Sequence, residues 1–281
     1  MRRRSAIRLL AALTLFFAYQ AWAQEAREEV VRIPASGTTL IATVMRPPGD
    51  DRRPLAIINH GSPAEASERP RMARPRFPVL SAWFLSHGYV VVLPLRRGYG
   101  ETGGAWAEDY GRCQAPDYYS AGLQGAADIK AALDYMRGLP YVAANQAIVV
   151  GQSAGGWATI ALSSYNPPGV PGMVNFAGGR GGQQMLPEGR LGNCTPEALV
   201  TAAGRYGATA RVPMLWLYTQ NDSFFEPALA RRMVEAYDTA GGRAALRAFG
   251  PFGNDGHALA SNSAGVAIWS DAVTSFLAGL R

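Results

Sequence analysis

The chain has 281 residues, of which 48% are hydrophobic and 17% are charged. This composition supports a large buried core and argues against intrinsic disorder, and the length fits one large α/β domain better than two small ones. The formal net charge is +6, but no cluster of basic and aromatic residues predicts nucleic-acid binding.

The first 23 residues have the pattern of a secretory signal peptide. Arginines at positions 2–4 and 8 precede an apolar run over Leu9–Ala18, and Ala21-Trp22-Ala23 places small residues where a signal peptidase reads the chain. The run is about ten residues, whereas a membrane span takes roughly 20. We therefore expect residues 1–23 to be cleaved; an uncleaved anchor or a buried helix is the alternative.

Cleavage would leave a mature domain over residues 24–281 that is periplasmic or secreted and has no stable membrane span. No cysteine follows the apolar run, which argues against a lipoprotein anchor. Without the four arginines, 27 basic residues become 23 against 21 acidic ones, so the mature net charge is +2. This small charge gives no reason to expect a polyanionic partner.

Eight strands are predicted in the mature chain. The first two, Glu29–Ile33 and Thr39–Met45, form an antiparallel pair joined through Ser36-Gly37. Several of the others are nearly continuous apolar runs, a pattern typical of strands that helices cover on both faces. These six are Leu55–Asn59, Tyr89–Leu93, Gln146–Val150, Met173–Phe176, Val212–Tyr218 and Ala244–Phe249.

Helical patterns fall between the later strands. They cover Phe77–Ser86, Tyr118–Met136, Ala154–Ser164, Pro227–Ala240 and Ser263–Leu280, and Gly88 is a predicted left-handed C-cap for the first. The alternation predicts an α/β fold with a doubly wound, mostly parallel eight-stranded sheet. Such sheets place ligand sites at the carboxyl ends of their strands.

Ser153 is the predicted nucleophile. It lies in Gly151-Gln152-Ser153-Ala154-Gly155, a G-x-S-x-G motif between an apolar strand and a small-residue helix. Such a sharp turn strains the backbone of the serine and requires small residues on both sides of it. The alternative is an ordinary glycine-rich turn whose serine caps a helix.

A serine hydroxyl needs an adjacent base, and the chain has only three histidines. His257 follows the last strand, where the base is expected when the chain order is Ser, acid, His. His87 ends a helix and is interpreted as a surface or capping residue. His60 directly follows a strand, and we expect its ring to brace that loop rather than to transfer protons.

Asp222 is the predicted acid, because it lies on the loop beyond the end of the strand Val212–Tyr218 and between the nucleophile and the base in the chain. Its role would be to hold the imidazole in one tautomer and to stabilise the imidazolium. Asp255 and Asp238 are the competing acids. The first is interpreted as shaping the histidine loop, and the second falls inside a helix.

The backbone N–H of Ala154 is one predicted donor of the oxyanion hole. The second donor comes from His60-Gly61-Ser62-Pro63; proline has no N–H, so Gly61 or Ser62 supplies it, and Ser62 is preferred. The segment Arg97–Gly104 is rich in glycine, but it lacks the spacing of a phosphate-binding loop and is interpreted as a pocket-lining loop.

Cys113 and Cys194 are the only cysteines. An even pair in a secreted protein predicts a disulfide, with two unpaired buried thiols as the alternative. Two cysteines without an adjacent histidine make a poor metal site, so no metal is expected.

Together, Asn59–Ser62, Arg97–Gly100, Gly151–Gly155, Asn221-Asp222 and Gly256-His257 resemble the motifs of the α/β-hydrolase superfamily. Within it, the chain is similar to the dienelactone-hydrolase-like and prolyl-oligopeptidase-like branches from roughly residue 38 onward. Dienelactone hydrolases proper have a cysteine nucleophile, whereas position 153 is serine. Prolyl-oligopeptidase relatives usually carry a large extra domain, for which this chain has no room.

The resemblance implies acyl transfer to water through an acyl-enzyme, without metal or organic cofactor. Residues 178–211, with a short helix near Pro196–Tyr206, are interpreted as a small cap, which a Cys113–Cys194 bond would tie down. Aromatic residues expected on the pocket walls are Tyr99, Trp106, Phe224 and Phe225. The same residue types also occur in cores, so the lining role is a hypothesis.

Three functions are compatible with these residues. An esterase acting on a small-molecule ester is preferred. A peptidase or amidase acting on a short peptide is the second, although no acidic pair is dedicated to a substrate amine. A binding protein without catalysis is the third, and the intact set Ser153, Asp222 and His257 argues against it. The sequence does not indicate an oligomeric state.

Overall fold

A single eight-stranded sheet forms the centre of the molecule. The computed structural model describes residues 26–186, 189 and 191–280, so the predicted signal peptide lies outside the described residues. The strand order is β1-β2-β4-β3-β5-β6-β9-β10. The strands from β4 to β10 run parallel, and β2 is antiparallel to both β1 and β4. The predicted doubly wound, mostly parallel α/β fold is confirmed.

The strands lie close to their predicted positions. Strand β5 begins four residues earlier than predicted, because Val142 extends the ladder by pairing with Arg53. The strands are β1 (Arg27–Ala35), β2 (Thr38–Arg46), β3 (Arg53–Asn59), β4 (Val90–Leu95), β5 (Val142–Gln152), β6 (Gly172–Phe176), β9 (Met214–Thr219) and β10 (Ala244–Phe249).

Both faces of the central strands are apolar. In β3, Leu55 and Ile57 belong to one buried cluster, whereas Ala56 and Ile58 belong to another. Because successive side chains of a strand point to opposite faces, each strand contributes to two cores. This explains why the central strands are continuous apolar runs in the sequence.

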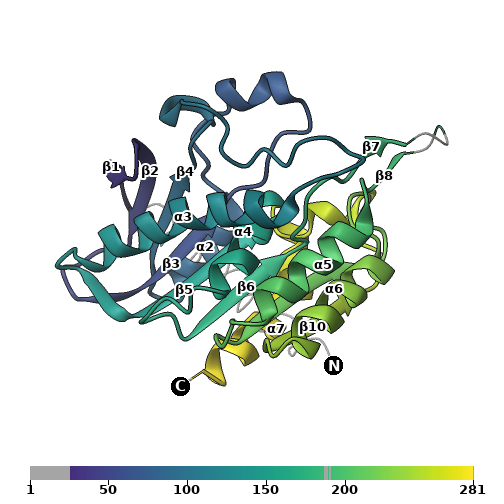
Figure 1. Cartoon of the computed structure of the whole chain (residues 1–281). Helices are drawn as coiled ribbons and strands as arrows, with labels where there is room; N and C mark the ends of the chain where they lie inside the picture. Colours follow the sequence, from purple (N-terminus) through teal and green to yellow (C-terminus); the bar gives the residue numbers. More distant parts are fainter. Residues whose placement is uncertain (1–25, 187–188, 190, 281) are drawn as a thin grey trace, which may run out of the picture.

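Helices cover both faces of the sheet (Figure 1). One face is covered by α3 (Tyr118–Arg137), α4 (Ala154–Ser163), α5 (Pro196–Gly207) and α6 (Pro227–Thr239). The other is covered by α2 (Pro78–Ser86) and α7 (Val266–Ala278), the latter preceded by a 3₁₀ turn, η4 (Ser263–Gly265). Within the described part of the chain, no helix is long and apolar enough to cross a membrane.

Short elements that the sequence did not predict lie at the carboxyl ends of the strands. They are the 3₁₀ helices η1 (Ala66–Arg71), η2 (Gly100–Thr102) and η3 (Gly256–Ala258), and a hairpin of β7 (Gln184–Met185) and β8 (Leu191–Gly192). The hairpin projects from the body of the molecule (Figure 1). One-turn helices and two-residue strands are too short to show a hydrophobic period in sequence.

The segment predicted as a cap, residues 178–211, has two structural parts. Its second part is α5, which packs beside α3 and α6 and contributes Leu199, Ala203 and Tyr206 to the core. Its first part includes residues 179–182 and 184, which line the pocket beside Ser153 described below. A cap role for the first part stays a prediction.

Cys113 and Cys194 form a disulfide across 81 residues of sequence, as predicted. Two hydrogen bonds support the bridge. Thr195 Oγ1 donates to the Cys113 carbonyl at 2.7 Å, and Tyr118 Oη donates to the Cys194 carbonyl at 2.6 Å. The bond therefore joins the segment before α3 to the segment before α5.

Replacing both cysteines by serine should lower the free energy of unfolding by about 2–5 kcal/mol, because the bond closes a long loop in the unfolded chain. Urea unfolding of the wild-type and double-variant proteins measures this difference. Thiol titration of the denatured, unreduced wild-type protein is the control, and two free thiols there would contradict the bond.

Candidate active site

The backbone of Ser153 is strained. Its φ of 55° and ψ of −122° place a non-glycine residue in a rarely populated region, at a cost of roughly 1–3 kcal/mol. Ser153 N donates to the Phe176 carbonyl at 3.0 Å, and the Ser153 carbonyl accepts from Trp157 N at 2.9 Å. The side chain makes no capping hydrogen bond to α4, so its hydroxyl is not used as a helix cap.

Gly151 and Gly155 allow this turn to pack against β3. A Cβ on Gly151 would lie 2.2 Å from the Gly155 carbonyl oxygen, and one on Gly155 would lie 2.2 Å from the Asn59 carbonyl oxygen. Both contacts are with backbone, which cannot move aside cheaply. The requirement for small residues beside Ser153 therefore has a steric cause in this structure.

Asp222 and His257 are brought together at the ends of β9 and β10. His257 Nδ1 lies 3.1 Å from each carboxylate oxygen of Asp222. The Asp222 side chain is fully buried, and its Oδ1 also accepts the backbone N–H groups of Phe224 and Phe225 at 2.9 and 3.0 Å. These contacts fix the carboxylate as the acceptor for an Nδ1–H, which leaves Nε2 as the free nitrogen of the ring.

The two competing acids have other contacts. Asp255 accepts hydrogen bonds from the backbone of His257 at 3.0 Å and from the hydroxyl of Ser223 at 2.6 Å, so it shapes the loop, as predicted. Asp238 accepts the backbone N–H of Ala244 at 2.7 Å, at the start of β10.

The histidine loop lies beside the serine turn. Gln152, the residue before Ser153, donates from Nε2 to the His257 carbonyl at 3.4 Å. Phe224 stacks on the His257 ring with 4.2 Å between ring centres, and Phe224 also lines the pocket that contains Ser153. The structure thus brings the loop that carries His257 next to the turn that carries Ser153, and Phe224 contacts both the His257 ring and the pocket.

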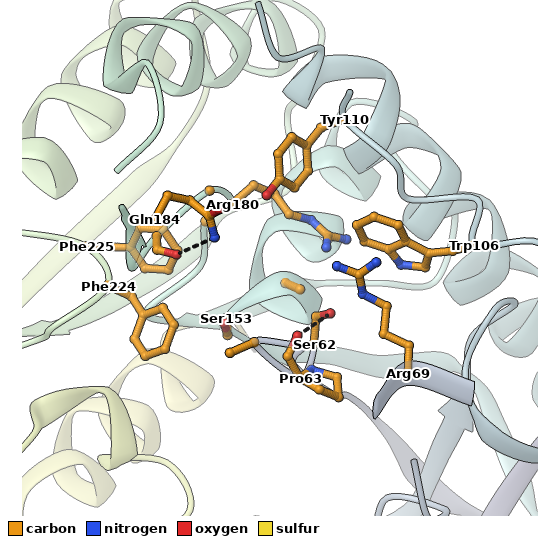
Figure 2. A pocket seen from close by; sticks show the side chains of 15 residues that line it. Ser62, Pro63, Arg69, Trp106, Tyr110, Ser153, Arg180, Gln184, Phe224 and Phe225 are labelled. Carbon is orange, nitrogen blue, oxygen red and sulfur yellow. Dashed lines mark hydrogen bonds between the residues drawn. The ribbon is translucent and has the colours of Figure 1, made fainter. Parts of the chain in front are cut away.

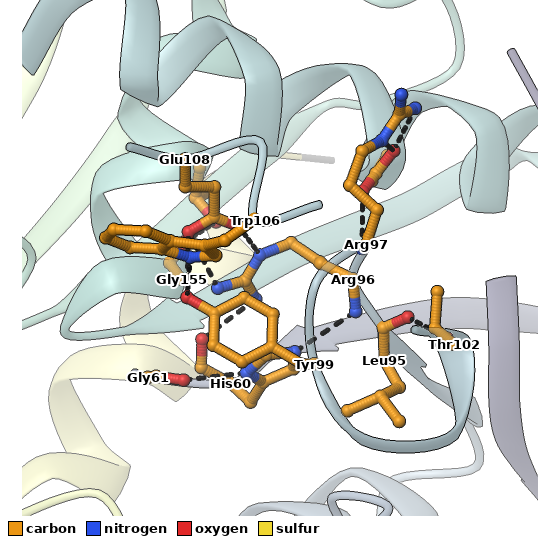
Figure 3. Close-up of polar contacts among 12 residues, drawn as sticks. His60, Gly61, Leu95, Arg96, Arg97, Tyr99, Thr102, Trp106, Glu108 and Gly155 are labelled. Atoms are coloured by element: carbon orange, nitrogen blue, oxygen red, sulfur yellow. Dashed lines mark hydrogen bonds and ion pairs between the residues drawn. The ribbon is translucent and has the colours of Figure 1, made fainter. Parts of the chain in front are cut away.

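His60 braces the loop that follows β3 (Figure 3). Its Nε2 accepts the backbone N–H of Arg96 at 3.2 Å, so Nδ1 carries the proton and donates to the Gly61 carbonyl at 2.7 Å. Burial, followed by the charge of Arg96, lowers the pKa of His60 well below its ordinary value of 6.5. The neutral ring is a structural brace, as the sequence predicted.

This brace sets the direction of the next peptide group. The two ends of a trans peptide point in opposite directions, so the Ser62 N–H points away from the His60 ring when the Gly61 carbonyl points toward it. Ser62 and Ala154 both line the pocket together with Ser153. As the first residue of α4, Ala154 has a backbone N–H without an intrahelical acceptor.

Trp106, Phe224 and Phe225, which the sequence suggests for the substrate pocket, line the cavity beside Ser153, and their contact with a substrate stays a prediction (Figure 2). Tyr99 does not line this cavity; it is fully buried behind Trp106, whose Nε1 donates to the Tyr99 hydroxyl at 2.9 Å. The hydroxyl faces an interior carboxylate, Glu108, at 3.3 Å. The structure therefore gives Tyr99 a supporting position instead of the predicted place on the pocket wall.

Sequence reasoning missed the charged residues of the pocket. Arg69 and Arg180 line it, and Arg180 forms a buried ion pair with Glu108, which also pairs with Arg96. One signal was available, since Arg180 stands in the glycine-rich run Gly178–Gly182 directly after a parallel strand.

Across residues 26–186, 189 and 191–280, no group of three or more His, Cys, Asp or Glu side chains could hold a metal ion.

Residues 75–168, about a third of the chain, match the model of the prolyl oligopeptidase family. This range includes Ser153 and ends before Asp222. No curated protein matches the sequence. The family match therefore covers the nucleophile alone among the three predicted catalytic residues.

Solved structures match the chain over nearly its whole length. A protein assigned as a dienelactone hydrolase from Klebsiella pneumoniae has a TM-score of 0.61 and 16% identity, covering 90% of this chain and 98% of its own. A Pyrococcus furiosus esterase has a TM-score of 0.62 and 16% identity, covering 90% and 92%. The chain has the α/β-hydrolase fold. Among structures with this fold, it resembles the dienelactone-hydrolase-like and prolyl-oligopeptidase-like branches.

A further α/β-hydrolase match is longer than this chain. The puromycin-hydrolyzing peptidase of Mycobacterium tuberculosis has a TM-score of 0.65 and 18% identity, covering 91% of this chain and 39% of its own. The chain thus spans about two fifths of the peptidase, but nearly all of the two proteins above.

The neutral His60 makes the stability of this fold depend on pH. Its folded pKa lies below the unfolded value of 6.5, so below that pH the unfolded state binds more protons and stability is lost as pH falls. Urea unfolding between pH 8 and pH 5 should show a shallower loss in His60→Gln, by up to about 1.4 kcal/mol per pH unit. Equal slopes in the two proteins would contradict a neutral His60.

Proposed function

We propose that the protein is a secreted serine hydrolase that cleaves carboxylic esters through an acyl-enzyme on Ser153. The observation that carries the proposal is the His257–Asp222 hydrogen bond beside a serine held at positive φ. Nucleophile, base and orienting acid then have the roles and chain order of a Ser-His-Asp triad. The comparisons support a hydrolase and leave the bond it cleaves open.

In the first half of the reaction, His257 Nε2 removes the proton of the Ser153 hydroxyl as Oγ attacks the ester carbonyl carbon. The backbone N–H groups of Ser62 and Ala154 stabilise the resulting oxyanion. The intermediate collapses when the C–O bond to the alcohol breaks and His257 returns the proton to the departing oxygen. Asp222 remains ionised and stabilises the imidazolium.

In the second half, water attacks the acyl-enzyme, and His257 takes one of its protons. The acid product leaves with a hydroxyl from water, and Ser153 Oγ regains the proton. Every atom of this cycle comes from the chain, the ester and water, so the proposal requires no metal or organic cofactor.

Secretion is part of the proposal. It rests on the signal-peptide pattern of residues 1–23 and on the Cys113–Cys194 bond, because structural disulfides persist mainly in oxidising compartments such as the periplasm. The domain boundaries at residues 24–281 are proposed on the same signal-peptide pattern, and the small-molecule ester substrate is proposed on the predicted triad.

A peptidase is the second candidate, favoured by the match to the prolyl oligopeptidase family. Against it, none of the described residues that line the pocket has a carboxylate for a substrate amine, and the nearby Glu108 is already paired with Arg96 and Arg180. Hydrolysis of 4-nitrophenyl esters without cleavage of aminoacyl 4-nitroanilides would support the esterase. The reverse result would support the peptidase.

Ser153→Ala should lower kcat for ester hydrolysis by about 10⁴-fold or more, because it removes the nucleophile. Ser164→Ala is the matched control. It replaces a serine just after the same helix, whose hydroxyl only bonds the Ala161 carbonyl. Initial rates with a 4-nitrophenyl ester measure both variants, and full activity in Ser153→Ala would contradict the mechanism.

A further inference from the structure

Two arginines form one end of the Ser153 pocket. Arg69 comes from η1 and Arg180 from the loop after β6, and their guanidinium groups converge beside Trp106 (Figure 2). The Cζ atom of Arg69 lies 3.4 Å from the centre of the Trp106 ring, and that of Arg180 lies 5.8 Å from it. The cationic groups therefore face the same space as the nucleophile.

The charge at this end is not balanced. Arg96 is fully buried and Arg180 is 4% exposed, and both pair with one carboxylate, Glu108. Arg69 adds a third guanidinium and has no ion pair with any described carboxylate. Of the nearby acids, Asp128 is paired with Arg97, and Asp109 bonds the backbone of Gly111. Three guanidinium groups thus share one carboxylate.

Two guanidinium nitrogens also lack acceptors. The Nε atoms of Arg69 and Arg180 are buried and have no hydrogen-bond partner among the described residues. Buried charged donors are normally paired, because losing water without gaining an acceptor is costly. A bound oxygen anion would supply both the missing acceptors and the missing negative charge.

The positive charge of the arginines also affects the pKa values of neighbouring groups. Burial lowers the pKa of Arg180, Tyr99 raises it, and the charges of Arg96 and Arg69 lower it. Burial raises the pKa of Tyr99, but Arg180 and Arg96, together with hydrogen bonds to Ser62 and Trp106, lower it to about 8. The contributions of the arginines have the sign expected beside neighbouring cations.

The position of His257 assigns this end of the pocket to one part of the substrate. His257 must protonate the departing alcohol, and it stacks on Phe224, so the alcohol leaves on the Phe224 side of Ser153. In Figure 2, Arg69 and Trp106 lie on the opposite side of Ser153 from Phe224. The acyl part of the substrate therefore extends toward the arginines.

We propose that Arg69 and Arg180 bind a carboxylate at the far end of the acyl group, so that the preferred substrates are monoesters of dicarboxylic acids. The planar fork of arginine matches a carboxylate, and Trp106 holds the Arg69 guanidinium in place by stacking against it. This substrate class rests on the proposed ester hydrolase.

The kinetic test compares two esters of equal chain length. Mono-4-nitrophenyl adipate ends in a carboxylate that is ionised at pH 7, whereas 4-nitrophenyl hexanoate ends in a methyl group. With the uncatalysed rates subtracted, kcat/KM for the adipate should exceed that for the hexanoate by about tenfold or more, the usual worth of a charge-assisted hydrogen bond. A ratio of one or below would overturn the proposal.

Arg69→Met and Arg180→Met should each abolish most of the preference, measured as the ratio of kcat/KM for the adipate to kcat/KM for the hexanoate. Arg69→Met is the safer variant for folding, because Arg69 makes no ion pair with a described residue. Arg205→Met is the matched control, since Arg205 stacks on Tyr119 at 3.5 Å in the same geometry but is not among the residues lining this pocket. An unchanged preference in Arg69→Met and Arg180→Met would also overturn the proposal.

A binding measurement separates failure of this inference from failure of the proposed function. Calorimetry with Ser153→Ala protein should show that adipate binds more tightly than hexanoate, and that Arg69→Met in the same background removes the difference. Hexanoate ester hydrolysis that depends on Ser153 tests the ester-hydrolase proposal alone. Equal binding of adipate and hexanoate, or binding of inorganic phosphate but not adipate, would contradict the carboxylate site whatever the activity.

Discussion

The turn at Ser153 must fit into almost no space. The chain leaves β5 and enters α4 within one residue, at a φ of 55°, and the following helix starts against the carbonyl groups of Asn59 and His60. A single methyl group on Gly155 would come within 2.5 Å of both carbonyl oxygens. The strained backbone persists because the sheet and α4 hold it from both sides. The same packing exposes the Ser153 side chain to the pocket.

The loops around this turn are held in place by buried charge. His60 follows β3, Arg96 follows β4, and Arg180 follows β6. Arg96 bonds the His60 carbonyl at 2.8 Å and pairs with Glu108, which also binds Arg180 (Figure 3). Three separate strand ends are thereby tied into one network beneath the pocket. Removing one partner of such a network is costly because it leaves an uncompensated buried charge.

The arginines of this network also bear on which substrates the pocket would prefer. A neutral pocket would have one carboxylate for each arginine, but the described residues at this end of the pocket include more arginines than carboxylates. The excess lies on the acyl side of Ser153, while the opposite side has the aromatic rings of Phe224 and Phe225. In the proposed mechanism, Ser153, Asp222 and His257 carry out the reaction, whereas Arg69 and Arg180 determine the preference for a charged acyl group.

Local patterns were sufficient to predict most of the fold. The apolar runs of β3, β4 and β5 identify strands buried on both faces. The strand-turn-helix context singles out Ser153 as the candidate nucleophile. Pairing across long stretches of sequence was not predictable. Nothing near Glu108 indicates that its partner is Arg180, 72 positions further on, and nothing near Tyr99 indicates that its hydroxyl bonds Trp106 and Glu108 in the interior. The short helix η1, which carries Arg69, has no hydrophobic period at all.

The most direct test of the central claim is a crystal structure of the protein after reaction with a fluorophosphonate. The account predicts phosphorus bonded to Ser153 Oγ, with a phosphoryl oxygen within hydrogen-bond distance of the backbone nitrogens of Ser62 and Ala154. His257 Nε2 should face the leaving-group side of the adduct, with Nδ1 still bonded to Asp222. Phosphorus on another residue, or a Ser62 N–H that points away from the phosphoryl oxygen, would contradict it.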